Sequence, residues 1–430
     1  MANTSVNWTQ GLAYAAVTDV GMRRSNNQDS HAVVLASDEM SWCRRGHVFI
    51  VADGMGAHAA GELASKLAAD NIPHTYKKLL DLPPPAAIAK SILNANDLIH
   101  GRGQASTDFH GMGTTCSTLI LLPQGALVAH VGDSRIYRLR ANKLEQLTFD
   151  HSLVWEMEAQ GLKTSGEGVV SVPKNVITRS LGPNAQAKVD LEGPLPIDIG
   201  DKYLLCSDGL TGPVTDEELG LILNCLPPQE AAQTLVDLAN VRGGPDNITV
   251  VIAQITGPLV SEAGQQMLAI MATEAAPKSS LRSILFAISG VVTALTVLFG
   301  VFGKILPAVL CGVAAIIAGA VAWKQKPNVK RPNMPGGYIG GPFGKGPHRA
   351  YDCRPRPEIV AQIETMVNKL EGIANSNGYH LNRGPFDTAR QAGVAAVAAG
   401  DSQAAVVAYS KAIRAMLVEL RNVRQRQASG

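Results

Sequence analysis

Four aspartates stand at the ends of short apolar stretches, each beside a glycine or an asparagine. They are Asp53, Asp133, Asp208 and Asp246. An apolar stretch that stops at such a turn is typical of a buried strand, which delivers the carboxylate to the open end of its sheet. Carboxylates that converge there, without a cluster of histidines and cysteines at ligand spacing, form a hard, oxygen-rich site. Such a site selects Mg²⁺ or Mn²⁺ over zinc or copper.

These residue types indicate metal-assisted attack on a phosphate group. Two ions that share a bridging carboxylate can share a water molecule and lower its pKa, which supplies hydroxide at neutral pH. Arg24, in the segment GMRRSNNQDS, is suited to hold the phosphate, because a guanidinium binds it through two parallel hydrogen bonds. Gly54 lacks a Cβ, so a backbone carbonyl can approach an ion closely. Taken singly, an Asp-Gly pair is more often only a turn.

Eight sequence blocks, in order along the chain, resemble the metal-dependent serine/threonine protein phosphatases of the 2C type (the PPM family). They are RRSNNQDS at 23–30, VADGMGAHAAGE at 51–62, GMGTTCSTLIL at 111–121, HVGDSRIYRLR at 130–140, LTFDHS at 147–152, VITRSLG at 176–182, LLCSDGL at 204–210 and GGPDNITVVIA at 243–253. The resemblance implies an α+β fold: a four-layer α/β/β/α sandwich of two antiparallel sheets flanked by helices.

The resemblance also implies two or three Mn²⁺ or Mg²⁺ ions and a role for each acid. Asp53 would bridge two ions, and the carbonyl of Gly54 would bind one of them. Asp208 and Asp246 would complete the shell of the second ion. Asp133 matches an acid that helps to hold a third metal in bacterial members of the family.

Two further positions match residues that act on the substrate and on water. Asp29 matches an outer-shell acid that positions metal-bound waters, and Arg24 matches the phosphate-binding arginine. The implied reaction is in-line attack on phosphorus without a phosphoenzyme. The implied substrates are proteins that carry phosphoserine or phosphothreonine, including protein kinases and their substrates. Met55 stands where eukaryotic members often have a histidine, so the leaving group would take its proton from water or from elsewhere.

The elements that must position these residues form one mixed α/β domain over residues 1–256. Strands are expected at 13–17, 49–52, 117–122, 127–131, 203–206 and 248–253, and helices at 60–72, 85–99, 153–160, 216–225 and 229–240. The turns at 123–125 and 132–135 are too short for a crossover helix, so antiparallel pairing is expected.

Composition excludes several classes of protein. A net charge of +2 with 17% charged residues leaves no basic face for nucleic acid. The six cysteines include no C-x-x-C pair, which disfavours a zinc site or a disulfide scaffold and suits reducing cytosol. The N-terminus lacks the basic-then-apolar layout of a signal peptide. The catalytic domain is therefore expected to face the cytoplasm.

Residues 283–323 are expected to form a transmembrane helical hairpin after a polar connector at 257–282. Two uncharged stretches, divided by Lys304, each approach the roughly 20 residues that cross a ~30 Å hydrocarbon core. Positive residues flank both ends, so both flanks are expected in the cytoplasm of a multi-pass protein of the inner (plasma) membrane. The alternative is a pair of buried core helices.

The remaining sequence predicts a Pro/Gly-rich linker at 324–357 and a small α-helical domain at 358–427. Part of the latter is similar to a tetratricopeptide hairpin, and a plain helical bundle is the alternative. We expect these helices to bind another protein and not to dock on the catalytic domain, because the linker is too flexible to transmit a rigid-body signal. The alternative function for the whole chain is a catalytically weak, phosphoprotein-binding membrane scaffold.

Overall fold

The computed structural model describes residues 9–57, 59–162, 164, 173, 176–260, 341–376 and 381–428, with short pieces between 293 and 313. The chain divides into two compact units, one formed by Met1–Gln265 with Ile339–Gly430 and the other by Gln266–Tyr338. The expected transmembrane hairpin at 283–323 and the connector at 257–282 fall largely outside the described residues. Within the described ranges, no helix is both long and apolar enough to cross a membrane.

Two antiparallel sheets form the centre of the first unit. One has the order β1 (Leu12–Asp19), β11 (Ile248–Ile255), β10 (Lys202–Cys206), β7 (Arg135–Arg140), β8 (Lys143–Gln146) and β12 (Arg349–Asp352). The other has the order β2 (Asp29–Val34), β3 (His47–Met55), β5 (Cys116–Leu122), β6 (Gly125–Val131) and β9 (Asp190–Leu195), and β4 (Gly113–Thr114) pairs with β3. The predicted antiparallel pairing is confirmed.

Short turns explain this pairing. Strands β7 and β8 are joined by Ala141 and Asn142, which both have positive φ (47° and 65°), the geometry of a type I′ hairpin. Strand β5 is buried at every position, because one of its faces packs on the other sheet and the second is covered by helices. The interface between the sheets contains large apolar side chains such as Phe49, Leu119 and Tyr203.

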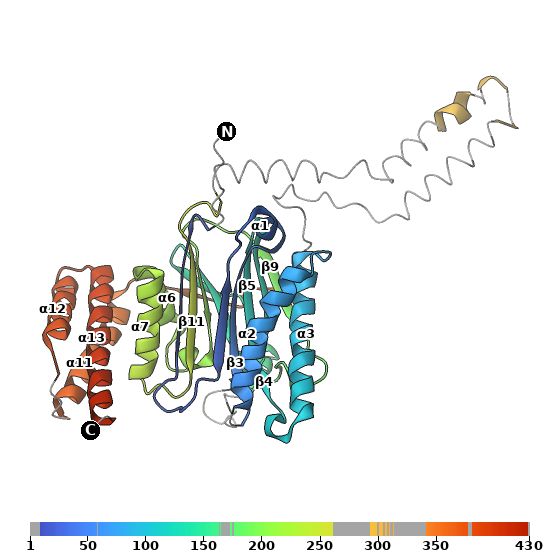
Figure 1. Cartoon of the computed structure of the whole chain (residues 1–430). Helices are drawn as coiled ribbons and strands as arrows, with labels where there is room; N and C mark the ends of the chain where they lie inside the picture. The colour runs from blue at the N-terminus through green and yellow to red at the C-terminus, as the bar shows by residue number, and fades with distance from the viewer. Residues whose placement is uncertain are drawn as a thin grey trace, which may run out of the picture. The chain divides into compact units, whose positions relative to one another are not determined.

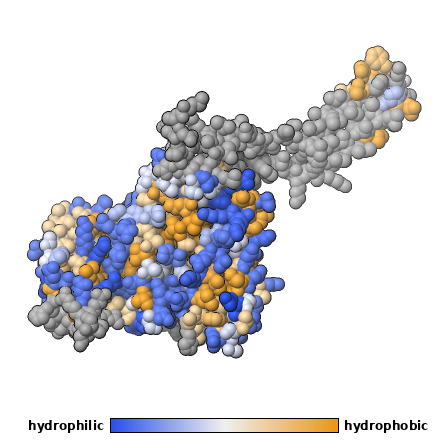
Figure 2. All heavy atoms as spheres, viewed as in Figure 1, coloured by the Kyte–Doolittle hydropathy of each residue, from blue (hydrophilic) through white to orange (hydrophobic). Residues whose placement is uncertain are grey.

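Helices cover the outer face of each sheet and complete four layers (Figure 1). Helices α2 (Ala60–Lys78) and α3 (Pro84–Ala105) share an apolar cluster with β3 and β5, while α6 (Asp216–Cys225) and α7 (Pro228–Val241) share one with β10 and β11. The shorter helices are α1 (Glu39–Arg45), η1 (Thr107–Phe109), α4 (Leu153–Ala159) and α5 (Asp208–Thr211). On the face seen in Figure 2, hydrophobic and hydrophilic residues are interspersed over the described part.

The predicted linker at 324–357 does not hold for its last residues. Strand β12 pairs with the edge strand β8, and the backbone of Phe343 pairs with that of Gly193. Directly after β12, Cys353 is fully buried in the same cluster as α6 and α7. The edge of a sheet offers unpaired backbone groups, so a short extended segment can be fixed there despite its Pro- and Gly-rich surroundings.

The expectation that the C-terminal helices stand apart from the catalytic domain is wrong. The described residues of the predicted helical segment 358–427 lie mainly in α11 (Pro357–Ser376), α12 (Gly384–Ala398) and α13 (Ser402–Ala428). Helix α13 packs on α7 and α6, and apolar residues of α11 and α13 belong to the cluster that fills the outer face of the β1–β12 sheet (Figure 1). Helices α11 and α12 pack in turn on α13, and all three belong to the same compact unit as the sandwich.

Candidate metal and phosphate site

The register of two neighbouring strands places Asp29 directly opposite Asp53. Asp29 is the first residue of β2 and Asp53 lies near the end of β3, where the two form a Cα pair. The backbone around Asp53 is fixed by Thr115, whose Oγ1 accepts from the Asp53 N–H at 2.9 Å and whose N–H donates to the Asp53 carbonyl at 2.8 Å. Next to them, the Gly54 N–H donates to the carbonyl of Gln28 at 3.1 Å.

Asp208 and Asp246 enter from the other sheet. Asp208 begins α5 just beyond β10, and Asp246 lies in the turn before β11. Between the sheets, the Ser207 hydroxyl donates to Oδ2 of Asp29 at 2.7 Å and accepts from the Thr249 N–H at 2.9 Å. This serine therefore ties the Asp208 strand end to Asp29.

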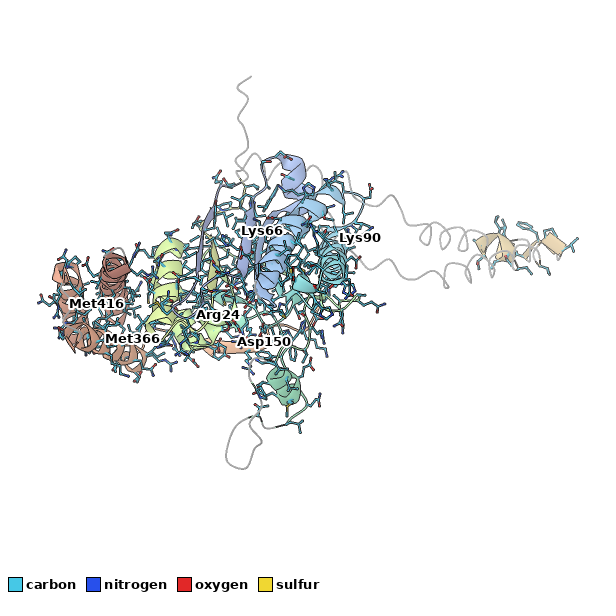
Figure 3. All side chains as sticks on the ribbon, turned by 60° about the horizontal axis from the view of Figure 1, so that its bottom comes forward. Arg24, Lys66, Lys90, Asp150, Met366 and Met416 are labelled. Carbon is cyan, nitrogen blue, oxygen red and sulfur yellow. The ribbon has the colours of Figure 1, made fainter. Side chains whose placement is uncertain are left out.

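Arg24 lies at the same end of the sandwich and pairs with Asp246. Its Nη2 donates to Oδ2 of Asp246 at 2.7 Å, and about half of its side chain (51%) is exposed to solvent. Figure 3, which turns the lower end of Figure 1 forward, shows Arg24 and Asp150 between the C-terminal helices and the helices that carry Lys66 and Lys90. The guanidinium is thus accessible to a ligand while one of its nitrogens is held.

The carboxylates influence one another strongly. Burial raises the pKa of Asp53 well above its usual range, and the charges of Asp29, Asp208, Asp133 and Asp246 raise it further. Burial and the neighbouring Asp208 and Asp246 raise the pKa of Asp29 to about 7. Burial also raises the pKa of Asp208, with Asp246 as the next cause. Each of these acids affects the pKa of at least one other, because the fold brings all five predicted acids close together.

Asp133 lies just beyond the end of β6 and is affected by the charge of the same cluster. Burial, together with Asp208 and Asp150, raises the pKa of Asp133 to about 7. Oδ1 of Asp133 and Oδ1 of Asp29 are buried and accept no hydrogen bond from any residue that the structure describes. A buried, unpaired carboxylate oxygen is unfavourable unless it is protonated or meets a cation.

The donor chemistry of this cluster fits Mn²⁺ or Mg²⁺. All five side chains offer carboxylate oxygens, and among them the buried Oδ1 atoms of Asp29 and Asp133 have no hydrogen-bond partner in the described part of the chain. In the described part of the chain, no three His, Cys, Asp or Glu side chains converge closely enough to enclose an ion as they stand. The residues therefore fit the ions by charge and ligand type, not by a closed coordination shell.

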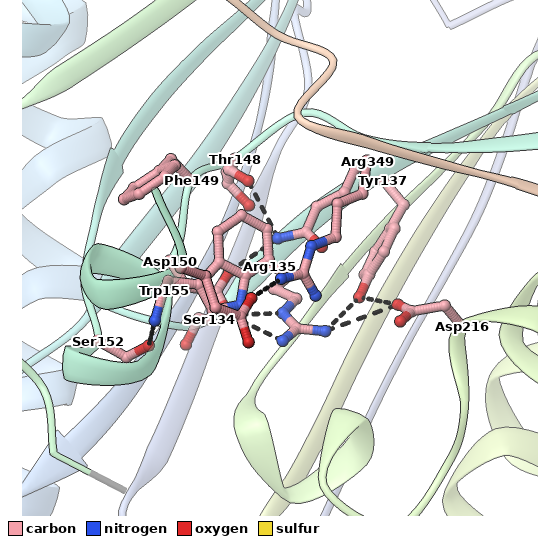
Figure 4. A network of polar contacts seen from close by, with 12 residues as sticks. Ser134, Arg135, Tyr137, Thr148, Phe149, Asp150, Ser152, Trp155, Asp216 and Arg349 are labelled. Atoms are coloured by element: carbon pink, nitrogen blue, oxygen red, sulfur yellow. Dashed lines mark hydrogen bonds and ion pairs between the residues drawn. The ribbon is translucent and has the colours of Figure 1, made fainter. Parts of the chain in front are cut away.

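A network beside Asp133 holds its turn in place (Figure 4). Arg135 pairs with Asp150 at 2.8 Å, and the hydroxyl of Tyr137 donates to Asp216 at 2.6 Å. The Ser134 hydroxyl lies 2.7 Å from Oγ1 of Thr115, which also binds the backbone of Asp53. Arg135 thus shapes the turn that presents Asp133.

The same network extends into the C-terminal segment, which sequence analysis missed. The Arg349 guanidinium lies 3.9 Å from the ring centroid of Trp155 in α4, and its Nη2 donates to Glu158 at 2.6 Å. These contacts fix α4, the helix that precedes residues 163–175. Residues 163–175 fall mostly outside the described ranges.

Asn247 is a second residue whose role the sequence did not reveal. Its Oδ1 accepts from the Gln28 N–H at 2.7 Å, and its Nδ2 donates to the carbonyls of Val20 and Asn26, both at 2.9 Å. The side chain therefore joins the loop that carries Arg24 to the turn that carries Asp246. Its position directly after Asp246, in the block GGPDNITVVIA, was the available signal.

Comparison with known proteins gives a consistent result. A family model described as protein phosphatase 2C matches residues 15–248. Protein phosphatase PhpP of Streptococcus pneumoniae is 37% identical over 250 residues, which cover 57% of this chain and 98% of PhpP. Among solved structures, the serine/threonine phosphatase of S. agalactiae is 34% identical with a TM-score of 0.50, covering 57% of this chain and 99% of that one. The catalytic domain of PstP in complex with two manganese ions is 34% identical with a TM-score of 0.48 and the same coverage.

Proposed function

Because this chain belongs to the protein phosphatase 2C family and is a metal-dependent serine/threonine protein phosphatase, we propose that the carboxylate cluster and Arg24 carry out its hydrolytic reaction. The observation that carries this proposal is the meeting of five acids from both sheets beside one half-exposed arginine. When bound, Mn²⁺ or Mg²⁺ lowers the pKa of a water molecule and offsets the charge of the phosphate.

Each side chain has a distinct part in this proposal. Asp53 would hold two ions, with the carbonyl of Gly54 on one of them, and Asp208 and Asp246 would hold the second. Asp133 would hold a third ion. The positions on the strand ends support these assignments, because all of these groups reach the same end of the sandwich.

Two residues would act on water and on the substrate. Asp29, held by Ser207, would orient water, since its free Oδ1 points to no other described partner. Arg24 would bind the phosphate through the part of its guanidinium that Asp246 does not occupy. Substrates would be phosphoserine and phosphothreonine proteins, including protein kinases and their substrates.

The test of these assignments is Asp208→Asn, compared with Asp70→Asn as a control at an exposed position in α2. Asp208→Asn should abolish Mn²⁺-dependent hydrolysis of a phosphopeptide and weaken Mn²⁺ binding in calorimetry, while Asp70→Asn should match the wild type. Chelation should stop the wild-type reaction. If Asp208→Asn kept more than about a tenth of wild-type turnover, its activation free energy would have risen by less than ~1.4 kcal/mol, and the role of Asp208 would be contradicted.

We also propose that residues 283–323 tether the enzyme to the inner membrane as a hairpin, with both flanks in the cytoplasm. Two uncharged stretches with positive flanks support this. Further support comes from the other unit, in which Met1–Gln265 and Ile339–Gly430 form one compact body, an arrangement that favours a hairpin over a single crossing. Extraction by alkaline carbonate would contradict the tether, and so would protease access to the two flanks from opposite faces of sealed vesicles.

Binding of another protein by α11, α12 and α13, and a tetratricopeptide-like character of the α12–α13 pair, stay predictions. A pull-down that compares the full chain with a chain carrying substitutions on the exposed face of α12, such as Val394→Asp, would test them.

A further inference from the structure

Helix α13 makes an ionic contact with the end of strand β1. Nη2 of Arg421 lies 3.1 Å from Oδ2 of Asp19 and 3.7 Å from Oδ1 of Asp237 in α7. Asp237 is almost completely buried, whereas Arg421 is 41% exposed. One C-terminal arginine therefore supplies positive charge to two acids of the sandwich.

Asp19 also anchors the start of the loop that carries Arg24. Its Oδ1 accepts from the Gly21 N–H at 2.9 Å and from Nδ2 of Asn240 at 3.1 Å. Each oxygen of this carboxylate thus has a separate task, one toward the loop and α7, the other toward α13. A shift of Asp19 would move the start of the loop directly.

The loop has little freedom to absorb such a shift. The Met22 N–H donates to the Gly244 carbonyl at 2.9 Å, and Asn247 bonds the carbonyls of Val20 and Asn26. Arg24 then pairs with Asp246. Backbone contacts on both sides of Arg24 therefore connect its guanidinium to the position of Asp19.

We propose that Arg421 is a positioning residue for phosphate binding, which holds the Arg24 loop in place through Asp19. The inference rests on the proposed function, since it assumes that Arg24 binds the phosphate of the substrate. It gives the docked C-terminal helix a part in the active site, although this helix lies outside residues 15–248, which the family model matches. The C-terminal residues would then tune affinity for phosphate without contacting the substrate.

The experiment compares full-length wild type with Arg421→Gln, Arg421→Lys and Asp19→Asn, assayed with Mn²⁺ on a phosphopeptide. Inorganic phosphate serves as a direct probe of the phosphate site. Arg421→Gln should raise KM and the inhibition constant for phosphate by about two- to fivefold, as expected for a partly exposed ion pair, with a smaller change in kcat. Arg421→Lys should restore most of the wild-type values, because it keeps the charge.

Two controls separate positioning from a general loss of stability. Lys411→Gln removes the same charge from an exposed position of the same helix and should leave KM and phosphate inhibition unchanged. Asp19→Asn approaches the pair from the other side, and its effect should match that of Arg421→Gln without adding to it in the double variant. A lower unfolding temperature with unchanged KM and phosphate inhibition would overturn the proposal.

The Arg24→Ala background separates the phosphate-binding role of Arg24 from the positioning role of Arg421. If Arg24→Ala impairs the enzyme, Arg421→Gln should cause no further rise in KM in that background, and a further rise would refute action through Arg24. If Arg24→Ala is impaired but Arg421→Gln alone behaves as wild type, only this inference fails. If Arg24→Ala itself hydrolyses the phosphopeptide normally, the phosphate-binding role of Arg24 fails, and the positioning role of Arg421 fails with it.

Discussion

Gly220 in α6 offers a direct test of how the C-terminal segment docks. A Cβ built at this position would overlap Sγ of Cys353 and lie 2.7 Å from its Cβ and 3.2 Å from the Cβ of Leu144. Cys353 is fully buried, and its N–H donates to the carbonyl of Asn142 at 2.8 Å. Gly220→Ala must therefore displace Cys353 and the end of β12, or push α6 away from the sheet.

Two opposing effects decide the magnitude. In a helix interior, alanine is more favourable than glycine by about 0.8–1 kcal/mol. Inserting a methyl group into a filled core costs about 1–3 kcal/mol. The overlap involves two atoms of a residue held by its backbone, so the upper part of that range applies. We expect a net loss of about 1–2 kcal/mol in the free energy of unfolding of the full chain.

The assay is urea denaturation in a double-mutant cycle with Cys353→Gly, which removes both clashing atoms. In that background the sign should reverse, and Gly220→Ala should stabilise the chain by about 0.5–1 kcal/mol. The control is Gly372→Ala in α11, where an added Cβ meets no atom within 4 Å. It should stabilise the chain in both backgrounds. If Gly220→Ala stabilised the otherwise unchanged protein as Gly372→Ala does, the docking of Cys353 on α6 would be refuted.

Three further predictions concern the site. Arg24→Ala should reduce kcat/KM on a phosphopeptide by roughly 10- to 150-fold, the value of a charged hydrogen bond of about 1.5–3 kcal/mol, and an unchanged rate would mean that another residue holds the phosphate. Arg349→Ala removes the contacts with Trp155 and Glu158, so hydrogen exchange in α4 should increase while kcat stays within about twofold, and unchanged exchange would show that the pair does not hold α4. Mn²⁺ binding near pH 6.5 should release protons, because the raised pKa of Asp29 and Asp133, about 7 each, keeps both carboxyl groups partly protonated in the metal-free protein. The apparent affinity for Mn²⁺ should accordingly fall as the pH drops through 7, and calorimetry that shows no dependence on the buffer would contradict this.

Much of the catalytic part could be predicted because its signals are local. Asp53-Gly54 and Asp208-Gly209 each follow an apolar stretch, and short turns between strands exclude parallel pairing. Asp29 was different, since only the register of β2 against β3 places it opposite Asp53. The family blocks supplied that information where the residue itself did not.

The C-terminal docking could not be predicted because its causes are distant in sequence. Four residues, Arg349–Asp352, become a strand only because β8 offers an open edge, and composition alone indicates a linker there. Cys353 is buried because Gly220, on a helix far earlier in the chain, leaves room for it. Likewise, Arg421 and Asp19 are paired by the packing of α13 on α7, which no periodicity reveals.

The position of β12 also determines when the protein can finish folding during synthesis. All the other strands of its sheet are complete once residue 255 has left the ribosome, yet the edge of β8 stays open until residues 349–352 follow. Closing a long loop costs only slightly more free energy than closing a short one, so the distance between β8 and β12 in the sequence hardly lowers the stability of the finished sheet. During synthesis, however, the edge of β8 stays exposed to solvent until β12 has been made. A prematurely terminated chain would carry every proposed metal ligand together with an unpaired strand edge, which is a site for aggregation and for recognition by chaperones. Full-length synthesis is therefore the step that protects this sheet.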